Sequence, residues 1–252
     1  MTRRTASRFG LIADVHANLQ ALETVLAHLD SESVEEIWCL GDVVGYGGDP
    51  SACVEVVRER CAGTVQGNHD AAAVRPELRA TFNPHARQAI EAQAGLLARD
   101  ELEWLAGLPR LIELEDVVLL HGSLADPAEF SYVLAAPDAR RELAAMSARW
   151  GFFGHTHVPA AWRMDPGGRV AAVPLPEPPA ELALEQPGRY LINPGAVGQP
   201  RDGDPRASCA IFERGSGRLR RLALEYDVAA AQSAILRSGM PPIEAERLVL
   251  GR

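Results

Sequence analysis

The stretch FGLIADVHANLQALETVLAHLD (Phe9–Asp30) decides the fold of the N-terminal half. It begins with an apolar run at residues 9–13, which predicts a buried strand that ends directly before Asp14 and His16. In the remainder of the stretch, leucine and valine recur at intervals of three and four residues, which is the spacing of an amphipathic helix. The stretch therefore predicts a strand followed by a helix, with polar side chains at the carboxyl end of the strand.

The same order of elements repeats along the chain. A second apolar run ends at Gly41-Asp42, and a glycine-rich loop separates it from a helix predicted over Pro50–Arg60, for which Asp49 is the expected N-cap. A third short strand is predicted at residues 63–66. Strands that alternate with helices predict right-handed crossovers and a largely parallel sheet.

Residues 71–107 predict helices only, and we interpret them as a helical cap inserted near the mouth of the site. The alternative is that they cover one face of the sheet. Strands are then predicted at 111–114, 117–120, 150–153, 160–164, 190–192, 207–212 and 219–224, with a helix before 150 and a final one at 228–237. We expect one α/β (α+β) domain over residues 1–252, with a pair of sheets flanked by helices on both outer sides.

Composition excludes several classes of function. The formal net charge of −9 argues against a nucleic-acid binder, so duplex nucleic acid is not an expected partner. All 25 basic residues are arginine, which excludes a Schiff-base or P-loop lysine. No apolar run approaches the length of a membrane span. The four cysteines have no CxxC spacing, which predicts neither a zinc cluster nor a disulfide framework and favours a cytoplasmic location.

Five apolar runs end in residue types that bind transition metals. Because sites in open α/β sheets form beyond the carboxyl ends of the strands, we expect these side chains to gather around one point. One such run would often be structural, but five in series predict a metal site. The candidate ligands are Asp14, His16, Asp42, Asn68, His121, His155 and His157.

This mixture of nitrogen and oxygen ligands fits divalent Mn, Fe, Zn, Ni or Co better than Ca. The number of candidate ligands is sufficient for two metal ions that share one carboxylate. Asp42 is our candidate for a carboxylate that bridges them. Two metals about 3.5–4 Å apart can clamp a phosphoryl group for in-line attack by metal-activated hydroxide. His69 is placed to protonate the leaving alkoxide, and we expect Asp70 to hydrogen-bond His69 and keep it protonated.

The blocks DVHAN, GDVVGYG, GNHD, HGS and GHTH, in this order, resemble the calcineurin-like metallophosphoesterase superfamily, and in particular its small bacterial and archaeal phosphodiesterase-like branch. The resemblance extends over Phe9–Tyr226. It implies a four-layer αββα sandwich with a dinuclear metal site at one edge. It also implies that Asp42 bridges the metals, and it divides the other ligands into Asp14, His16 and His157 on one metal and Asn68, His121 and His155 on the other.

Three further residues are candidates for contact with the substrate, and each has a structural alternative. Asn18 could contact a ligand or hold its loop, and Tyr46 could stack on a base or pack under the cap. Arg201, in the loop Asn193–Arg206, could pair with a phosphate or belong to a surface turn. Ala17 stands where many relatives have glycine, which costs little unless this residue needs a positive φ.

The leading hypothesis is a dinuclear metal-dependent phosphoesterase that hydrolyses small phosphodiesters or nucleotides, similar to the cyclic nucleotide phosphodiesterases. Alternatives of the same reaction class are a diadenosine polyphosphate hydrolase and a phosphomonoesterase or protein phosphatase. The helical cap and the acidic charge favour a small soluble substrate. A non-enzymatic scaffold would be expected to lack some ligand residues, and a nuclease would be expected to carry a basic groove.

Overall fold

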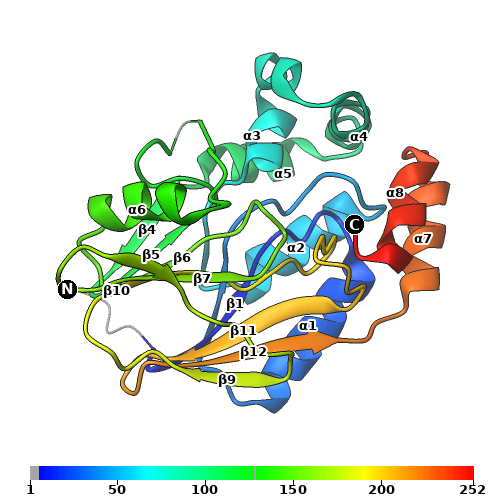
Figure 1. The fold of residues 1–252 in the computed structure, drawn as a ribbon. Helices are drawn as coiled ribbons and strands as arrows, with labels where there is room; N and C mark the ends of the chain where they lie inside the picture. Colours follow the sequence, from blue (N-terminus) through cyan, green and yellow to red (C-terminus); the bar gives the residue numbers. More distant parts are fainter. Residues whose placement is uncertain (1–5, 128) are drawn as a thin grey trace.

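The computed structural model describes residues 6–127 and 129–252, and its first half alternates strands with helices as predicted (Figure 1). The elements in chain order are β1 (Arg8–Ile12), α1 (Leu19–Ser31), β2 (Glu36–Cys39), α2 (Pro50–Arg60) and β3 (Gly63–Thr64). Asp49 is the N-cap residue of α2, but its side chain makes no capping hydrogen bond and instead accepts one from Gln20. The prediction of Asp49 as the N-cap residue is thus confirmed, but the side-chain capping hydrogen bond is absent.

Four helical segments follow. They are α3 (Asn68–Val74), the 3-10 helix η1 (Pro76–Thr81), α4 (Pro84–Ala94) and α5 (Arg99–Gly107). The helical prediction for residues 71–107 is therefore confirmed. Helix α5 packs against α2 and α3, and its Leu105 lies fully buried in the core. Helices η1 and α4 stand away from the sheets at the top of Figure 1. Of the predicted helical cap, only η1 and α4 therefore project from the rest of the molecule, whereas α5 packs against it.

The second half consists mostly of strands. Its elements are β4 (Leu111–Leu114), β5 (Val117–Leu120), α6 (Ala136–Ala145), β6 (Trp150–Phe152), β7 (Ala160–Met164), β8 (Val170–Ala172), β9 (Ala180–Ala183), β10 (Arg189–Asn193), β11 (Ala207–Glu213), β12 (Arg218–Leu224), α7 (Val228–Arg237), α8 (Pro242–Glu246) and η2 (Arg247–Leu250). Strands β8 and β9 were not expected. Each is an edge strand of only three or four residues, which is too short to give a reliable periodic pattern.

The strands form two six-stranded sheets, in the orders β3-β2-β1-β11-β12-β9 and β4-β5-β6-β10-β7-β8. Strands β1, β2 and β3 pair in parallel, as do β5, β6 and β10. The prediction of a largely parallel sheet holds only for β1–β3, because β11, β12 and β9 extend that sheet in antiparallel fashion. A tight turn between paired Glu213 and Arg218 joins β11 to β12, whereas a parallel pair needs a long crossover.

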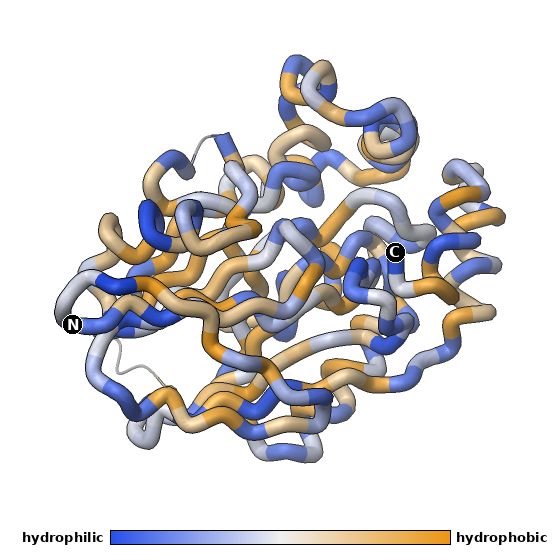
Figure 2. The backbone as a smooth tube through the Cα atoms, viewed as in Figure 1, coloured by the Kyte–Doolittle hydropathy of each residue, from blue (hydrophilic) through white to orange (hydrophobic). Residues whose placement is uncertain are grey.

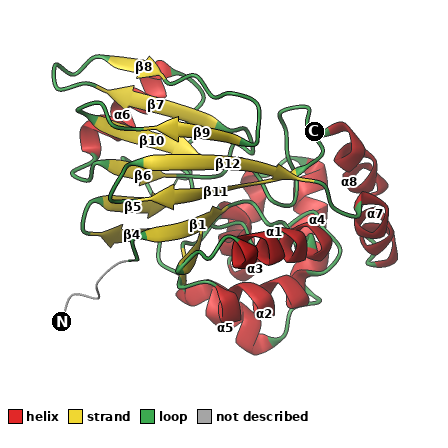
Figure 3. Cartoon of the chain, turned by 90° about the horizontal axis from the view of Figure 1, so that it is seen from below, coloured by secondary structure: helices red, strands yellow, loops and turns green. Residues whose placement is uncertain are grey.

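The two sheets pack face to face through large aromatic side chains. Phe212 of β11 meets Phe9 of β1 and Phe152 of β6 edge-on, with ring centroids 5.4 and 5.1 Å apart. The apolar faces of α1 and α2 cover the outside of the first sheet, and α6 covers the outside of the second through Leu143 (Figure 3). Apolar residues accordingly follow the strands and the inner faces of these helices (Figure 2). The expected four-layer αββα sandwich is confirmed.

Within the described ranges, no helix is long and apolar enough to cross a membrane. All four cysteines carry free thiols, so the structure contains no disulfide framework. Cys39, Cys53 and Cys209 are buried, and Cys39 packs in the apolar core beneath α1 and α2, as expected for a small apolar residue.

Candidate metal centre

The loops after β1 and β2 run side by side and bring the first ligands together. The Asp14 N–H donates to the Gly41 carbonyl at 3.0 Å, and the His16 N–H donates to the Asp42 carbonyl at 2.9 Å. Gly198 allows a third segment to approach, since a Cβ there would lie 1.8 Å from the Val15 carbonyl oxygen. The segments therefore pack too closely to be rearranged by small side-chain movements.

Five of the predicted ligands have left-handed backbone conformations. Their φ angles lie between 47° and 69°, at Asp14, His16, Asp42, His155 and His157. Such angles are unfavourable for residues other than glycine, and they cluster where surrounding contacts force a functional geometry. Ala17 also has a positive φ, of 51°, so the condition under which alanine is costly at this position is met.

Three histidines are oriented by backbone carbonyls. The Nδ1 atoms of His16, His121 and His157 lie 2.9, 2.7 and 2.6 Å from the carbonyl oxygens of Val44, Leu40 and Gln199. A carbonyl can only accept, so each Nδ1 carries a proton, and in the neutral ring the Nε2 presents a lone pair. This is the outer-shell arrangement that orients histidine ligands in metal sites.

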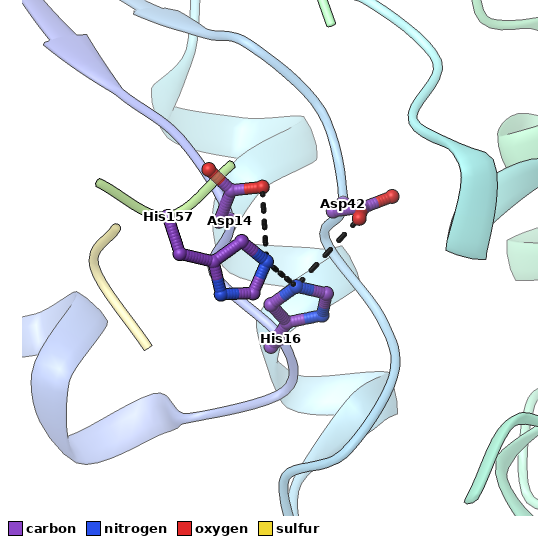
Figure 4. A group of neighbouring side chains, drawn as sticks. All are labelled: Asp14, His16, Asp42 and His157. Atoms are coloured by element: carbon purple, nitrogen blue, oxygen red, sulfur yellow. Dashed lines mark hydrogen bonds and ion pairs between the residues drawn. The ribbon is translucent and has the colours of Figure 1, made fainter. Parts of the chain in front are cut away.

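The presented Nε2 atoms of His16 and His157 face each other at 3.0 Å, as Figure 4 shows. With both rings neutral, neither nitrogen has a proton to donate, so the two lone pairs are placed to bind one cation. The Oδ1 atom of Asp14 lies 3.5 Å from the His157 Nε2, and the Oδ2 atom of Asp42 lies 3.6 Å from the His16 Nε2. Ligand atoms of these four residues all fall within 4.8 Å of one another.

A second group of ligand atoms shares the Asp42 carboxylate. The Nε2 atom of His121 lies 3.2 Å from both the Asp42 Oδ2 and the Asn68 Oδ1. Asp42, His121 and His155 have donor atoms within 4.8 Å of one another. The structure thus gathers all seven predicted ligands into two groups, and Asp42 lies between them. All the side chains in both groups could hold divalent metal ions, and the chemistry of their donor atoms fits such ions.

Burial and mutual contact shift the ionisation of these groups. Burial opposes charge on Asp42 and on His121, but their mutual attraction outweighs it. The pKa of Asp42 therefore falls well below its usual range, and that of His121 rises to about 9. Burial raises the pKa of Asp14 to about 7. The protons on Asp14 and His121 are ones that a bound cation would displace.

The expected pairing of Asp70 with His69 is wrong. The Asp70 carboxylate instead accepts hydrogen bonds from the backbone N–H groups of Asp42, Val43, Val44 and Gly67, at 2.8–3.2 Å. Asp70 thereby fixes the loop that carries Asp42. The His69 Nδ1 atom is buried without a hydrogen-bond partner, and burial lowers the pKa of His69 to about 4. Burial therefore keeps His69 neutral near pH 7.

The substrate-contact candidates separate into two kinds. Asn18 caps α1 by accepting from the Ala21 N–H, and its amide group donates to the Gly198 carbonyl, so it holds its loop. Tyr46 is nearly buried and packs against His16 and His69, with ring centroids 4.7 and 4.6 Å away. Asn18 therefore has a structural role, whereas Tyr46 packs against two site histidines and also lines the cavity beside Asn68 and His69.

Arg201 is only half-buried and faces the ligand groups. Its backbone N–H donates to the His157 carbonyl, and its guanidinium lies 5.6 Å from the centre of the Tyr46 ring. Burial lowers the pKa of His157 most, and the charge of Arg201 lowers it further. The guanidinium is therefore within electrostatic reach of the candidate metal centre.

A cavity of about 460 Å³ opens beside Asn68, His69 and His155. Its walls come from η1 and the start of α4 on one side, and from the loop after His121 on the other. Four aromatic side chains line it, Tyr46, Phe82, Phe130 and Tyr132, and the sequence interpretation missed all but Tyr46. The Tyr132 ring stacks on His155, with centroids 4.0 Å apart. The two aromatic residues of the segment EFSY (Glu129–Tyr132) were the sequence signal that could have predicted this part of the lining.

Comparisons with known proteins agree with this geometry. The chain is 41% identical to a metallophosphoesterase from Sphaerobacter thermophilus, whose crystal structure matches 98% of this chain and 100% of that one with a TM-score of 0.88. It is 34% identical to an uncharacterized protein of Methanocaldococcus jannaschii, over 98% of this chain and 99% of the relative. A hypothetical protein from Pyrococcus horikoshii shares the fold, with a TM-score of 0.78 at 15% identity, over 97% of this chain and 98% of that one.

The match to a family covers most of the two sheets. Residues 8–217 match the family described as the calcineurin-like phosphoesterase superfamily domain, whose members use dinuclear divalent metal centres. All five sequence blocks that carry the resemblance lie inside this range. The chain belongs to the calcineurin-like phosphoesterase superfamily.

Proposed function

We propose that the protein is a dinuclear metal-dependent hydrolase of small phosphodiesters or nucleotides. The observation that carries the proposal is the position of Asp42. Its Oδ2 atom lies 3.2 Å from the His121 Nε2 of one ligand group and 3.6 Å from the His16 Nε2 of the other. A buried carboxylate between two sets of imidazoles is suited to bridge two cations.

In this proposal the two ligand groups hold one divalent ion each, with Asp42 shared. The first ion is bound by Asp14, His16 and His157, and the second by Asn68, His121 and His155. Mn, Fe, Zn, Ni and Co all suit these donors. When bound there, two such ions would supply Lewis acidity for a phosphoryl group and would lower the pKa of a water molecule, which is the chemistry that in-line hydrolysis at phosphorus requires.

The surrounding residues orient the ester. Arg201 pairs with the non-bridging oxygens of the phosphoryl group, for which its planar guanidinium is suited. His69 lines the cavity beside Asn68 and donates an N–H to the leaving oxygen. Asp70 acts indirectly, because its contacts fix the loop of Asp42. The negative charge that develops on the phosphoryl and leaving oxygens during hydrolysis therefore meets polar groups that the fold has already positioned.

The cavity supports an ester with an organic group on each side of phosphorus. Its aromatic side chains stand on both walls, Phe82 on one and Phe130 and Tyr132 on the other, and so offer stacking surfaces for two organic groups, of which a phosphomonoester carries only one. This favours a diester, including a cyclic nucleotide, over a phosphomonoester. Diadenosine polyphosphates are the second candidate, because they too carry planar bases. The free cysteines support a cytoplasmic location for this reaction.

The test begins with metal content and turnover of the purified protein. We expect about two equivalents of divalent metal and Mn²⁺-stimulated hydrolysis of bis-p-nitrophenyl phosphate. A panel of 2′,3′- and 3′,5′-cyclic nucleotides, dinucleoside polyphosphates and phosphomonoesters then ranks the substrates. Absence of turnover with every metal, together with substoichiometric binding, would refute the proposal.

A further inference from the structure

The C-terminal helices α7 and α8 lie outside the part of the chain that matches the family, which ends at residue 217. They nevertheless pack close to the candidate metal centre (Figure 1). Ile235 of α7 and Ala245 of α8 share an apolar cluster with Tyr46, the residue that packs against His16 and His69. The tail is thus well placed to act on the site.

One polar side chain of the tail enters this region. Glu244 of α8 is 1% exposed, and its Oε2 atom accepts a hydrogen bond of 3.0 Å from the Nε2 atom of Gln199. Gln199 is also 1% exposed. Its carbonyl oxygen accepts the hydrogen bond from the Nδ1 atom of His157, so Gln199 is in direct contact with a predicted metal ligand. Burial raises the pKa of Glu244 and opposes its charge, and the guanidinium of Arg247, whose Nη1 atom lies 3.5 Å from the same Oε2 atom, offsets part of this effect.

Gln199 passes the contact on to Arg201. Its Oε1 atom accepts from the Arg201 Nη2 at 2.7 Å and from the Arg201 Nε at 3.2 Å. These two bonds occupy one side of the guanidinium. Within the described ranges, no carboxylate forms an ion pair with Arg201, so its other N–H groups face Tyr46 and the site.

The chemistry of the three groups fixes the direction of this chain of hydrogen bonds. Arginine can only donate, and an ionised carboxylate can only accept. The Gln199 amide must therefore turn its NH₂ towards Glu244 and its oxygen towards Arg201. An amide in place of the carboxylate could present either its oxygen or its NH₂ group to Gln199, so it would no longer fix the orientation of the Gln199 amide. A flipped Gln199 amide would present N–H groups to a guanidinium.

We propose that Glu244 is a positioning residue for Arg201, acting through Gln199, so that a helix outside the family-matched region sets how the phosphoryl group is bound. This rests on the proposed function, since Arg201 is the residue that takes the phosphoryl oxygens. Glu244 itself touches neither the ligand groups nor the cavity beside His69.

The test is a double-mutant cycle between Glu244→Gln and Arg201→Ala, measured in the Mn²⁺-loaded protein. Arg201→Ala should lower kcat/KM for bis-p-nitrophenyl phosphate by about 10–100-fold, mainly through KM, because a charge-assisted hydrogen-bond pair is lost. Glu244→Gln alone should lower it by about three- to tenfold, again mainly through KM. In the Arg201→Ala background the same change should have almost no further effect, because residues that act through one another are not additive.

Two further variants separate positioning from fold stability. The exchange variant Gln199→Glu with Glu244→Gln restores an acceptor for Arg201 and a donor behind it, so it should recover kcat/KM to within about threefold of the parent. Glu246→Gln, an exposed change on the same helix, is the matched control and should leave KM unchanged. Melting temperature and metal content should be similar in all variants.

Binding of inorganic phosphate, measured by calorimetry, repeats the comparison without turnover. An inactive parent protein would refute the proposed function, and phosphate affinities would still report on Glu244. Equal losses from Glu244→Gln in both backgrounds, in KM or in phosphate affinity, would overturn the positioning role. So would no loss in the parent background.

Discussion

Replacing Asp42 with asparagine tests the shared carboxylate directly. The Asp42 Oδ1 atom accepts the His69 N–H at 2.8 Å, and its Oδ2 atom faces the Nε2 atoms of His16 and His121. An asparagine can keep the bond to the His69 N–H only with its oxygen at the Oδ1 position. Its NH₂ group then points at the metal positions, where it cannot act as a ligand.

The magnitude follows from the lost charge. A unit charge pair at about 4 Å is worth about 4 kcal/mol at the effective dielectric of a partly buried site. Each divalent ion loses at least one such contact, so affinity for each should fall by about 10³-fold. The metal-free variant should stay folded, since the new NH₂ can donate to the free Nε2 atoms.

The assay is metal analysis after dialysis, combined with calorimetric titration of Mn²⁺ and melting temperature. Asp49→Asn is the matched control, because Asp49 follows in the same loop without facing the ligands. It should bind metal as the parent does. If Asp42→Asn retains two equivalents with affinities within about tenfold of the parent, the shared-carboxylate reasoning is refuted.

Three other changes have defined outcomes. His69→Ala should keep its metal and lower kcat by about 10²-fold or more for diesters with alkyl leaving groups, with a smaller loss for p-nitrophenyl esters; loss of metal would contradict this role. Ala17→Gly should raise the melting temperature by about 2 °C, because it relieves a φ of 51°, whereas Ala27→Gly in the exposed face of α1 should lower it. Apparent Mn²⁺ affinity should rise about tenfold per pH unit between pH 7 and 9, since the contact with Asp42 raises the pKa of His121 to about 9 and metal binding displaces the proton that His121 holds in this range. Below pH 7 the slope should steepen as Asp14, whose pKa is raised to about 7, also binds a proton; a pH-independent affinity in competition with a chelator would exclude both protons.

Local sequence patterns accounted for the elements that carry the site. The apolar run before Asp14 and the helical spacing after it are both short-range signals, so β1 and α1 could be predicted nearly to the residue. The ligand residues could be predicted for the same reason, because each of them follows the end of a strand within a few positions. Edge strands β8 and β9 escaped prediction, since one paired side and partial exposure leave little periodicity to detect.

The sequence by itself determined which side chains stand at the strand ends, and the tertiary structure decided which of them meet. His16 and His157 face each other across 141 residues of chain, a separation over which no periodicity carries information. Asp70 was paired with its neighbour His69 by proximity in sequence, but the fold brings the Asp42 loop to its carboxylate instead. The contact from Glu244 to Gln199 is of the same kind, because the two residues are 45 positions apart in the chain and meet only in the assembled fold. Hydrogen-bond direction and distance belong to the assembled fold, whereas residue type and strand order are already present in the chain.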